Sequence, residues 1–183
     1  MRRIALSAGH SNVKGQDRGA QGNGILEGEE TVVFRDLVKL RLEKHGVKVS
    51  VDPNSSVTGD TVRLFKKYFS GSDVCIDIHF NSASSPNATG TEVIIPVKYS
   101  RYEHDLALAL CQIISSTLGI KNRGFKTELQ TPRKKLFWMT IPAETVLIET
   151  CFLSNLRDVQ SYKANKEELA NAVGDIIYYW LKK

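Results

Sequence analysis

The sequence of 183 residues has few of the features that mark membrane proteins or disulfide-stabilised proteins. Its cysteines are three in number and form no C-x-x-C pair, so neither a disulfide framework nor a cysteine zinc site is indicated. No apolar run approaches the roughly 18 residues that a membrane-spanning helix needs. The first residues pass directly into polar sequence, without the long apolar segment of a signal peptide. We therefore expect no membrane insertion, and buried free thiols at Cys75, Cys111 and Cys151.

The chain has a net positive charge, which constrains its binding partner only loosely. There are 25 Lys and Arg against 20 Asp and Glu, a net charge of +5, which favours encounter with polyanions such as nucleic acid or an anionic cell wall. The aromatic residues are not interleaved with Lys and Arg as a base-stacking surface requires, so we expect no nucleic-acid partner. The length, with 42% apolar residues and no low-complexity tract, predicts one domain over residues 1–183. No separate wall-binding domain is expected.

Short apolar segments rich in Val and Ile alternate with segments of helical period. The predicted strands occupy residues 3–7, 47–51, 74–79, 92–97 and 145–150. The predicted helices are one that ends at Gly46, one over 61–69 that Asp60 caps, one over 102–118, and one that follows its apolar stripe over 169–181. This alternation predicts an α/β domain of three layers, with helices on both faces of a mostly parallel twisted sheet.

Polar residues follow three of the predicted strands. His10 comes after the first strand, across a break at Gly9, while His79 ends the third strand and Glu149 ends the last. A polar side chain at the end of a core strand is costly unless it has a partner or a task. Ligands collect at the carboxyl ends of the strands in open parallel sheets. We therefore expect these three side chains to belong to one site.

A glutamate ahead of the first helix, Glu27, adds a further carboxylate. Glu29 and Glu30 stand close enough to compete with it, although acids at this place commonly favour the helix dipole. Two imidazoles and one carboxylate make a three-ligand zinc site with an open position, as catalytic zinc requires. A second carboxylate is then left as acid and base. Zinc lowers the pKa of a bound water from about 15.7 to about 7, so the chemistry needs no serine or cysteine nucleophile.

Four separated motifs carry a more specific signal. In chain order they are 8–10 (AGH) with 17–20 (DRGA), 24–27 (GILE), 78–81 (IHFN) with 90–93 (GTEV), and 149–155 (ETCFLSN). Together, and over nearly the whole chain, they resemble the zinc amidase family called amidase type 3, which includes bacterial wall amidases and phage endolysins. Cys151 stands where the family commonly has Gly, and residues 7–8 (SA) replace a frequent Asp-Pro. Neither departure removes a ligand.

The resemblance implies a site and an activity. One zinc ion per chain would be held by His10, Glu27 and His79, and Glu149 would be the catalytic residue. Counting back from Gly46 along the family's helix favours Glu27 over its neighbours. The implied enzyme is a hydrolase that cuts the amide bond between N-acetylmuramic acid and the L-alanine of the peptidoglycan stem peptide. A one-domain amidase without an export leader resembles a phage endolysin. Such an antimicrobial enzyme is made in the host cytoplasm and acts on the wall after the membrane is breached.

Three other interpretations compete with this one. A zinc endopeptidase or carboxypeptidase acting on peptidoglycan peptides would use the same metal chemistry, although the chain has neither H-E-x-x-H nor an H-x-x-E pair. A Cys–His hydrolase using Cys151 and His79 would leave His10 and Glu149 without a role. A non-catalytic module that binds the wall or nucleic acid would fit the basic charge. Zinc content separates such a module from the enzyme.

Two further features are interpreted from their position alone. The segment 130–138 is a candidate substrate wall in which Arg133 or Lys135 would meet stem-peptide carboxylates, although basic residues in loops are commonly just solvated. Glu92 could reach the site from its strand, but it is expected to be exposed on an edge strand, where it needs no function.

Overall fold

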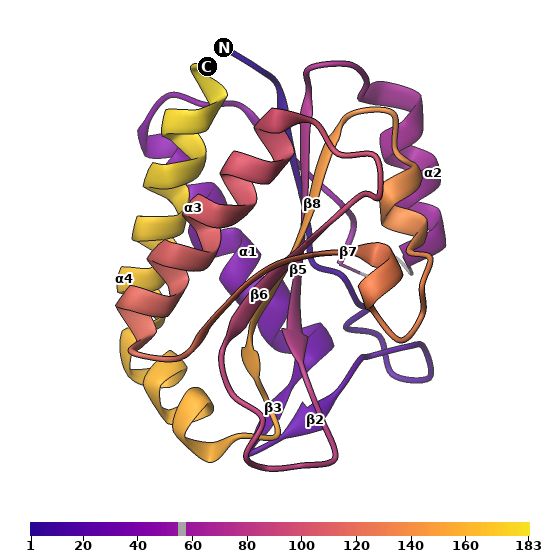
Figure 1. Cartoon of the computed structure of the whole chain (residues 1–183). Coiled ribbons are helices and arrows are strands. Elements are labelled where there is room, and N and C mark those ends of the chain that lie inside the picture. Colours follow the sequence, from indigo (N-terminus) through magenta and orange to yellow (C-terminus); the bar gives the residue numbers. More distant parts are fainter. Residues whose placement is uncertain (55–57) are drawn as a thin grey trace.

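A six-stranded sheet organises the chain (Figure 1). The computed structural model of the protein describes residues 1–54 and 58–183. In their spatial order the strands are β4 (Val49–Val51), β1 (Ile4–Ser7), β5 (Val74–Asn81), β8 (Glu144–Phe152), β6 (Thr91–Ile95) and β7 (Asn122–Thr127). A separate two-stranded hairpin is formed by β2 (Gln21–Gly22) and β3 (Ile25–Leu26). The helices are α1 (Glu27–Lys44), α2 (Thr58–Tyr68), α3 (Arg101–Leu118) and α4 (Leu156–Leu181), with two 3-10 turns, η1 (Glu128–Gln130) and η2 (Phe137–Thr140).

The sheet is mostly parallel, as predicted. β4, β1, β5 and β8 run in the same direction, whereas β6 pairs antiparallel with β8, and β7 pairs parallel with β6. The reversal brings the beginning of β6 to the edge where β5 and β8 end. Glu92 near the start of β6 is thus the register partner of Glu149 in β8.

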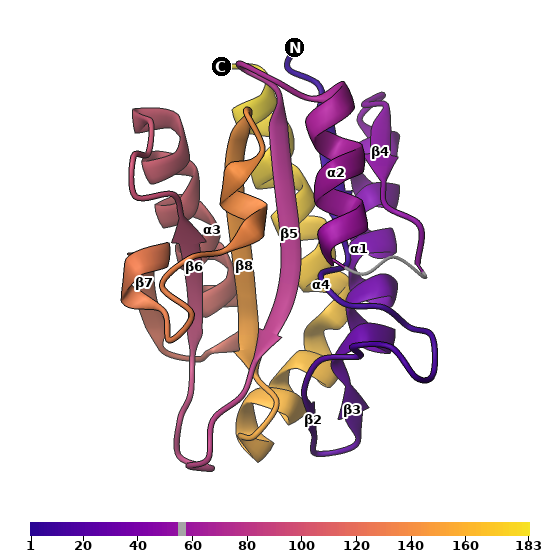
Figure 2. The same ribbon diagram turned by 90° about the vertical axis from the view of Figure 1, so that its right-hand side faces the viewer.

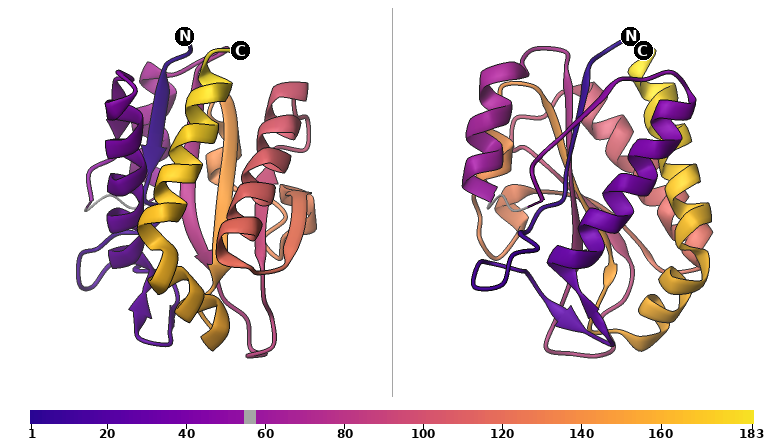
Figure 3. Two further views of the ribbon diagram at one scale, coloured as in Figure 1. Left: turned by 90° about the vertical axis from the view of Figure 1, so that its left-hand side faces the viewer. Right: turned by 180° about the vertical axis from the view of Figure 1, so that it is seen from behind.

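Helices cover both faces, which confirms the three-layer α/β class. The long helices α1, α3 and α4 lie together on one face (Figure 3), where their apolar residues join the larger core cluster. On the other face α2 and η2 lie over the sheet (Figure 2) and form a smaller cluster around Phe65 and Trp138. This second layer leaves side chains at the carboxyl ends of β5 and β8 available for a site.

The helix predictions hold best where caps are explicit in the sequence. α3 begins after a capping box of Ser100 and Glu103 and ends at Gly119, which adopts a φ of +62°. α4 begins much earlier than residue 169, because the Asn155 side chain accepts hydrogen bonds from the backbone N–H groups of Arg157 and Asp158. The prediction that Asp60 caps α2 was wrong, since Asp60 lies inside its first turn.

The environment predicted for Glu92 was also wrong. Glu92 is only 6% exposed, and β6 is an interior strand because β7 pairs with its outer side. The sequence of β7, NRGFKT, contains one large apolar residue, so its polar pattern hid the strand. The edge strand on this side of the sheet is therefore β7.

Two expectations about composition can be compared with the structure. Cys75, Cys111 and Cys151 are all buried free thiols, as predicted. Among the helices of the described residues, none is both long enough and apolar enough to cross a bilayer.

Candidate active site

Two strands present polar side chains on the same face of the sheet. Side chains alternate between faces along a strand, and Cys75 and Leu147 belong to the core cluster under α2. Asp77 and His79 follow Cys75 at even spacing, and Glu149 follows Leu147 in the same way. His79 and Glu149 are register partners on the adjacent parallel strands β5 and β8. Their side chains therefore stand side by side where these strands end.

A glycine allows the chain after β1 to approach His79. Gly9 has a φ of +65°, and a Cβ there would lie 2.5 Å from His79 Nε2 and 2.7 Å from the Ile78 carbonyl oxygen. The next residue, His10, places its ring edge-to-face with that of His79, with centroids 4.9 Å apart. The close approach of the two imidazoles thus depends on the absence of a side chain at position 9.

The hairpin β2–β3 delivers Glu27 to the start of α1, where it is 3% exposed. Its carboxylate is held by backbone donors: the Phe80 N–H donates to Oε1 (3.0 Å) and the Ala20 N–H donates to Oε2 (2.8 Å). A Cβ at Gly19 would collide with this carboxylate and with the His10 ring. The oxygens of Glu27 are therefore fixed in place before any ligand binds.

The three predicted metal ligands meet in one cluster. Glu27 Oε1 lies 3.1 Å from His79 Nδ1 and 3.5 Å from His10 Nε2. One candidate ligand atom from each of the three residues falls within 4.8 Å of the others. The residues come from three separate segments of the chain, and the parallel sheet brings them together. His10 and His79 are each 13% exposed, so the cluster is accessible from solvent.

Two aspartates that sequence reasoning missed stand behind the histidines. Asp77 Oδ2 lies 3.0 Å from His79 Nε2, and Asp17 Oδ1 lies 3.3 Å from His10 Nδ1. Carboxylates in this position typically orient the imidazoles that bind a metal. The spacing of two residues between Asp77 and His79 was an available signal, because it places both side chains on one face of a strand.

The electrostatics of the metal-free cluster suit cation binding. Burial lowers the pKa of His10, and the charge of His79 lowers it further. Burial alone would raise the pKa of Glu27, but the hydrogen bond and charge of His79 outweigh burial and lower it. Burial opposes charge on His79 as well, yet Asp77 and Glu27 hold the pKa of His79 well above its ordinary value. A neutral His10 and an ionised Glu27 are the forms that bind metal, whereas at His79 a metal competes with a proton.

Glu149 carries a carboxylate beside His79, and one of its two oxygens is unpaired within the part of the chain that the structure describes. Its Oε2 is buried and has no hydrogen-bond partner among the described residues. Burial raises the pKa of Glu149 to about 8 in the metal-free protein; the charge of His79 opposes this rise and the charge of Glu27 adds to it. A buried carboxyl group poised near neutral pH beside a candidate metal site is typical of a general base or acid.

The donor set of the cluster fits zinc. Two imidazole nitrogens and one carboxylate oxygen are the ligands of one common class of catalytic zinc site, which keeps a further position open. The buried Oε2 of Glu149 lacks a hydrogen-bond partner among the described residues, as expected beside a site built for a ligand. Within residues 1–54 and 58–183, His10, Glu27 and His79 are the one group of this kind that could hold a metal ion.

Comparison with known proteins identifies the family. Residues 4–179 match the family model described as N-acetylmuramoyl-L-alanine amidase. The chain belongs to this family. It is 29% identical over 182 residues to the N-acetylmuramoyl-L-alanine amidase LytC of Bacillus subtilis, which covers 96% of this chain and 35% of LytC. The chain thus spans about a third of the length of that relative.

Solved amidase structures share the fold. The N-acetylmuramoyl-L-alanine amidase from Clostridium difficile 630 superposes with a TM-score of 0.80 at 21% identity, covering 100% of this chain and 97% of that one. The catalytic domain of the CD27L endolysin, which targets Clostridia difficile, superposes with a TM-score of 0.77 at 22% identity, covering 98% of each chain. The sheet and helices of the present chain thus form the fold of these solved amidase structures.

The structure separates Glu27 from the two glutamates that follow it in this amidase-family chain. Glu29 is exposed and pairs with Arg18. Glu30 accepts a hydrogen bond from the Tyr162 hydroxyl (2.9 Å) and pairs with a lysine of α4. Neither glutamate belongs to the histidine cluster. The geometry therefore favours the register inferred for Glu27.

The predicted substrate wall, residues 130–138, includes the end of η1 and the start of η2. Arg133 and Lys135 are exposed, and no side-chain contact among the described residues links either to the cluster of His10, Glu27 and His79. Their role in substrate binding stays a prediction.

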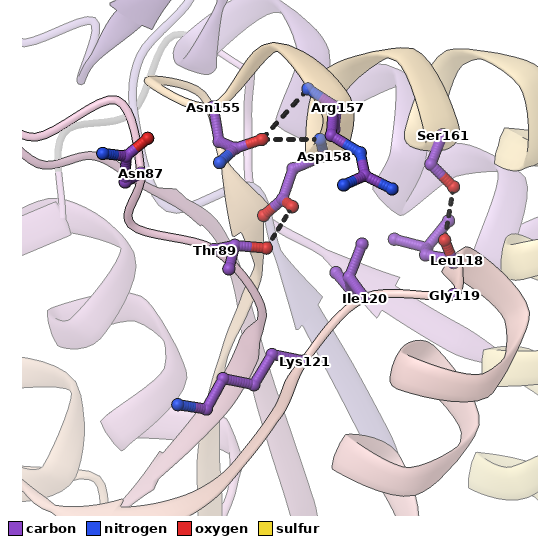
Figure 4. Close-up of a pocket in the computed structure, with 10 residues that line it drawn as sticks. All are labelled: Asn87, Thr89, Leu118, Gly119, Ile120, Lys121, Asn155, Arg157, Asp158 and Ser161. Carbon is purple, nitrogen blue, oxygen red and sulfur yellow. Dashed lines mark hydrogen bonds between the residues drawn. The ribbon is translucent and has the colours of Figure 1, made fainter.

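A hollow with a different set of lining residues is shown in Figure 4. It has a volume of about 440 Å³ and lies between the end of α3, the start of α4 and the loop before β6. Lys121 and Arg157 line it, and the buried Asp158 accepts hydrogen bonds from Thr89 and Gly90 at its wall. None of the four predicted site residues lines this hollow.

Proposed function

We propose that this chain is a zinc-dependent N-acetylmuramoyl-L-alanine amidase that hydrolyses the bond between N-acetylmuramic acid and L-alanine in peptidoglycan. The observation that carries the proposal is the convergence of His10, Glu27 and His79 within 4.8 Å, beside Glu149, in a chain of this family. Residues 1–183 would then act as one catalytic domain. Peptidoglycan is the substrate, and one zinc ion per chain is the cofactor.

His10, Glu27 and His79 would hold the zinc ion. When bound, zinc supplies a Lewis acid that polarises the scissile carbonyl and makes a water molecule acidic near neutral pH. Asp77 positions the His79 ring from behind, and the backbone donors at Phe80 and Ala20 position the Glu27 carboxylate. These contacts fix the ligands on strand and helix ends, so little reorganisation is needed when the site fills.

Glu149 would serve first as general base and then as general acid. Its carboxylate takes a proton from the attacking water as the water oxygen bonds to the muramoyl carbonyl carbon. It then gives that proton to the alanine nitrogen as the carbon–nitrogen bond breaks, so the peptide leaves as a free amine. The unpartnered Oε2 of Glu149 and its raised pKa support this role.

Digestion of purified sacculi tests the proposed reaction. We expect free stem peptides that begin with L-alanine, together with glycan strands that have lost their peptides, measured by mass spectrometry and amino-terminal analysis. New amino termini inside the cross-links would support an endopeptidase, and release of carboxyl-terminal residues would support a carboxypeptidase. A zinc-loaded Glu149→Gln protein is the control for contaminating hydrolases.

The finer part of the proposal is that the protein acts as a phage endolysin. The same fold serves the catalytic domain of the CD27L endolysin and the amidase from Clostridium difficile 630, so the fold is compatible with this role. An endolysin made in the host cytoplasm should lyse the cells only after a pore-forming agent opens the membrane. Wall degradation by the intact protein before the membrane is opened would contradict it.

A further inference from the structure

One acidic and two basic residues on β6 and β7 extend the row of polar side chains that begins with His79 and Glu149. Glu92 on β6 is the register partner of Glu149. Arg123 and Lys126, which belong to β7, both lie beside Glu92. Lys126 is paired in register with Ile94, which belongs to the core cluster under α2. We call Glu92, Arg123 and Lys126 the basic cluster. It lies on the sheet face that carries Glu149 and His79.

The basic cluster has more positive charge than its carboxylate can neutralise. Arg123 Nε and Lys126 Nζ both contact Glu92 Oε2, at 2.5 and 2.8 Å, while Asn81 donates to Glu92 Oε1 (3.2 Å). Two cations on one carboxylate leave a net charge of +1. One cation would suffice to offset the buried Glu92, so the second is not explained by ion pairing alone.

The two cations also keep unused hydrogen-bond donors. Arg123 donates through Nη1 to the Thr89 carbonyl oxygen at 3.4 Å, but no described residue accepts from its Nη2. The Lys126 ammonium has three N–H groups and, among the described residues, only Glu92 as a charged partner. Both side chains remain 28–30% exposed. An anion from solvent can therefore reach them.

We propose that Lys126 and Arg123 bind a carboxylate of the stem peptide and so select acidic peptides over amidated ones. This inference rests on the proposed amidase function. The muramoyl carboxyl group is consumed in the scissile amide, so acid groups close to the cut lie on the peptide side. The peptide then runs from Glu149 toward β7, and the glycan lies toward β1.

The spacing of the strands limits which carboxylate of the stem peptide can reach Lys126 and Arg123. Adjacent strands are about 4.8 Å apart, so β7 lies roughly 10 Å from β8. An extended peptide covers about 3.3–3.6 Å per residue. The carboxylate bound by Lys126 and Arg123 therefore belongs to one of the first three residues after the cut bond.

Binding to an inactive protein tests the inference without turnover. The probes are two soluble muramoyl peptides that differ only in whether the carboxyl groups of the second and third peptide residues are free or amidated. In a zinc-loaded Glu149→Gln background, Lys126→Gln should weaken calorimetric binding of the acid peptide at least about tenfold more than binding of the amidated peptide. Lys126→Arg should restore most of the preference, because it keeps the charge.

Lys121→Gln is the matched control. Lys121 is an exposed lysine just before β7 that lines the hollow of Figure 4, and its loss should leave the preference for the acid peptide unchanged. Equal weakening of both peptides by Lys126→Gln, or no weakening of either, would overturn the inference. Failure of the wild-type enzyme to cut either peptide at the muramoyl bond would instead overturn the proposed function.

Discussion

At the scale of single residues, the sequence predicted the candidate site residues better than it predicted the residues that position them. His10, His79 and Glu149 were singled out because polar groups at the ends of apolar strands need an explanation, whereas Glu27 was chosen through the family resemblance. The structure brings His10, Glu27 and His79 together. Asp77 was missed although its spacing of two residues from His79 places both side chains on one face of β5. Asp17 was missed because its contact with His10 depends on the path of the loop after β1.

The choice among three neighbouring glutamates can be tested directly. Glu27→Gln should lose stoichiometric zinc, because the amide is a far weaker ligand than the carboxylate that lies 3.1 Å from His79. Glu29→Gln and Glu30→Gln are matched controls that remove the same charge outside the cluster and should keep zinc in elemental analysis. Full zinc content in Glu27→Gln would refute the assignment.

Glu149→Gln separates chemistry from metal binding. The amide keeps the size of the side chain but cannot accept a proton, so the rate on muramoyl peptide should fall at least roughly 10²-fold while zinc content and fold are retained. Turnover numbers and circular dichroism measure the two effects. Near-normal turnover would exclude Glu149 as the base, and loss of zinc would make it a ligand.

At the scale of elements, periodicity and caps predicted most of the fold. The five predicted strands and α3 were confirmed because their apolar runs and capping residues act locally. β7 was missed because an edge strand can be polar, and the first half of α4 was missed among charged residues. There, Asn155 and the buried pair Val159 and Tyr162 were a usable helix signal.

The turn after β1 gives a test at this scale. Gly9→Ala should lose about 1–2 kcal/mol of unfolding free energy from its left-handed backbone, and it should also lose zinc because the new Cβ would meet His79. Gly15 also has a positive φ, but no atom lies within 4 Å of its Cβ position. Gly15→Ala should therefore lose stability and keep zinc. Equal zinc loss in both variants would contradict the steric explanation.

At the scale of the whole molecule, the sheet joins distant segments into one site. Residues from the loop after β1, the start of α1 and the ends of β5 and β8 meet because parallel strands end at the same edge. The reversed β6 adds Glu92 to that edge, a residue to which the expectation of an exposed edge strand had given no function. The match over residues 4–179 fits this shared architecture.

Zinc should therefore stabilise the folded chain as well as activate it. A chelator should abolish activity, and stoichiometric zinc should restore it. Because the ligands converge only in the folded protein, zinc at about 100 times its dissociation constant should add about 2.7 kcal/mol of stability, seen as a higher Tm. The His10→Ala protein should show no such rise. An unchanged Tm with zinc would contradict a preformed site in the wild-type chain.

The position of bond cleavage is tested most directly by hydrolysis in water labelled with heavy oxygen. If water attacks the muramoyl carbonyl carbon, one labelled oxygen should appear in the muramic acid carboxyl group for each new L-alanine amino terminus, and none in the peptide. Mass spectrometry of the separated glycan and peptide products reads both. Label in a peptide carboxyl group, with the muramoyl amide intact, would contradict the proposed amidase.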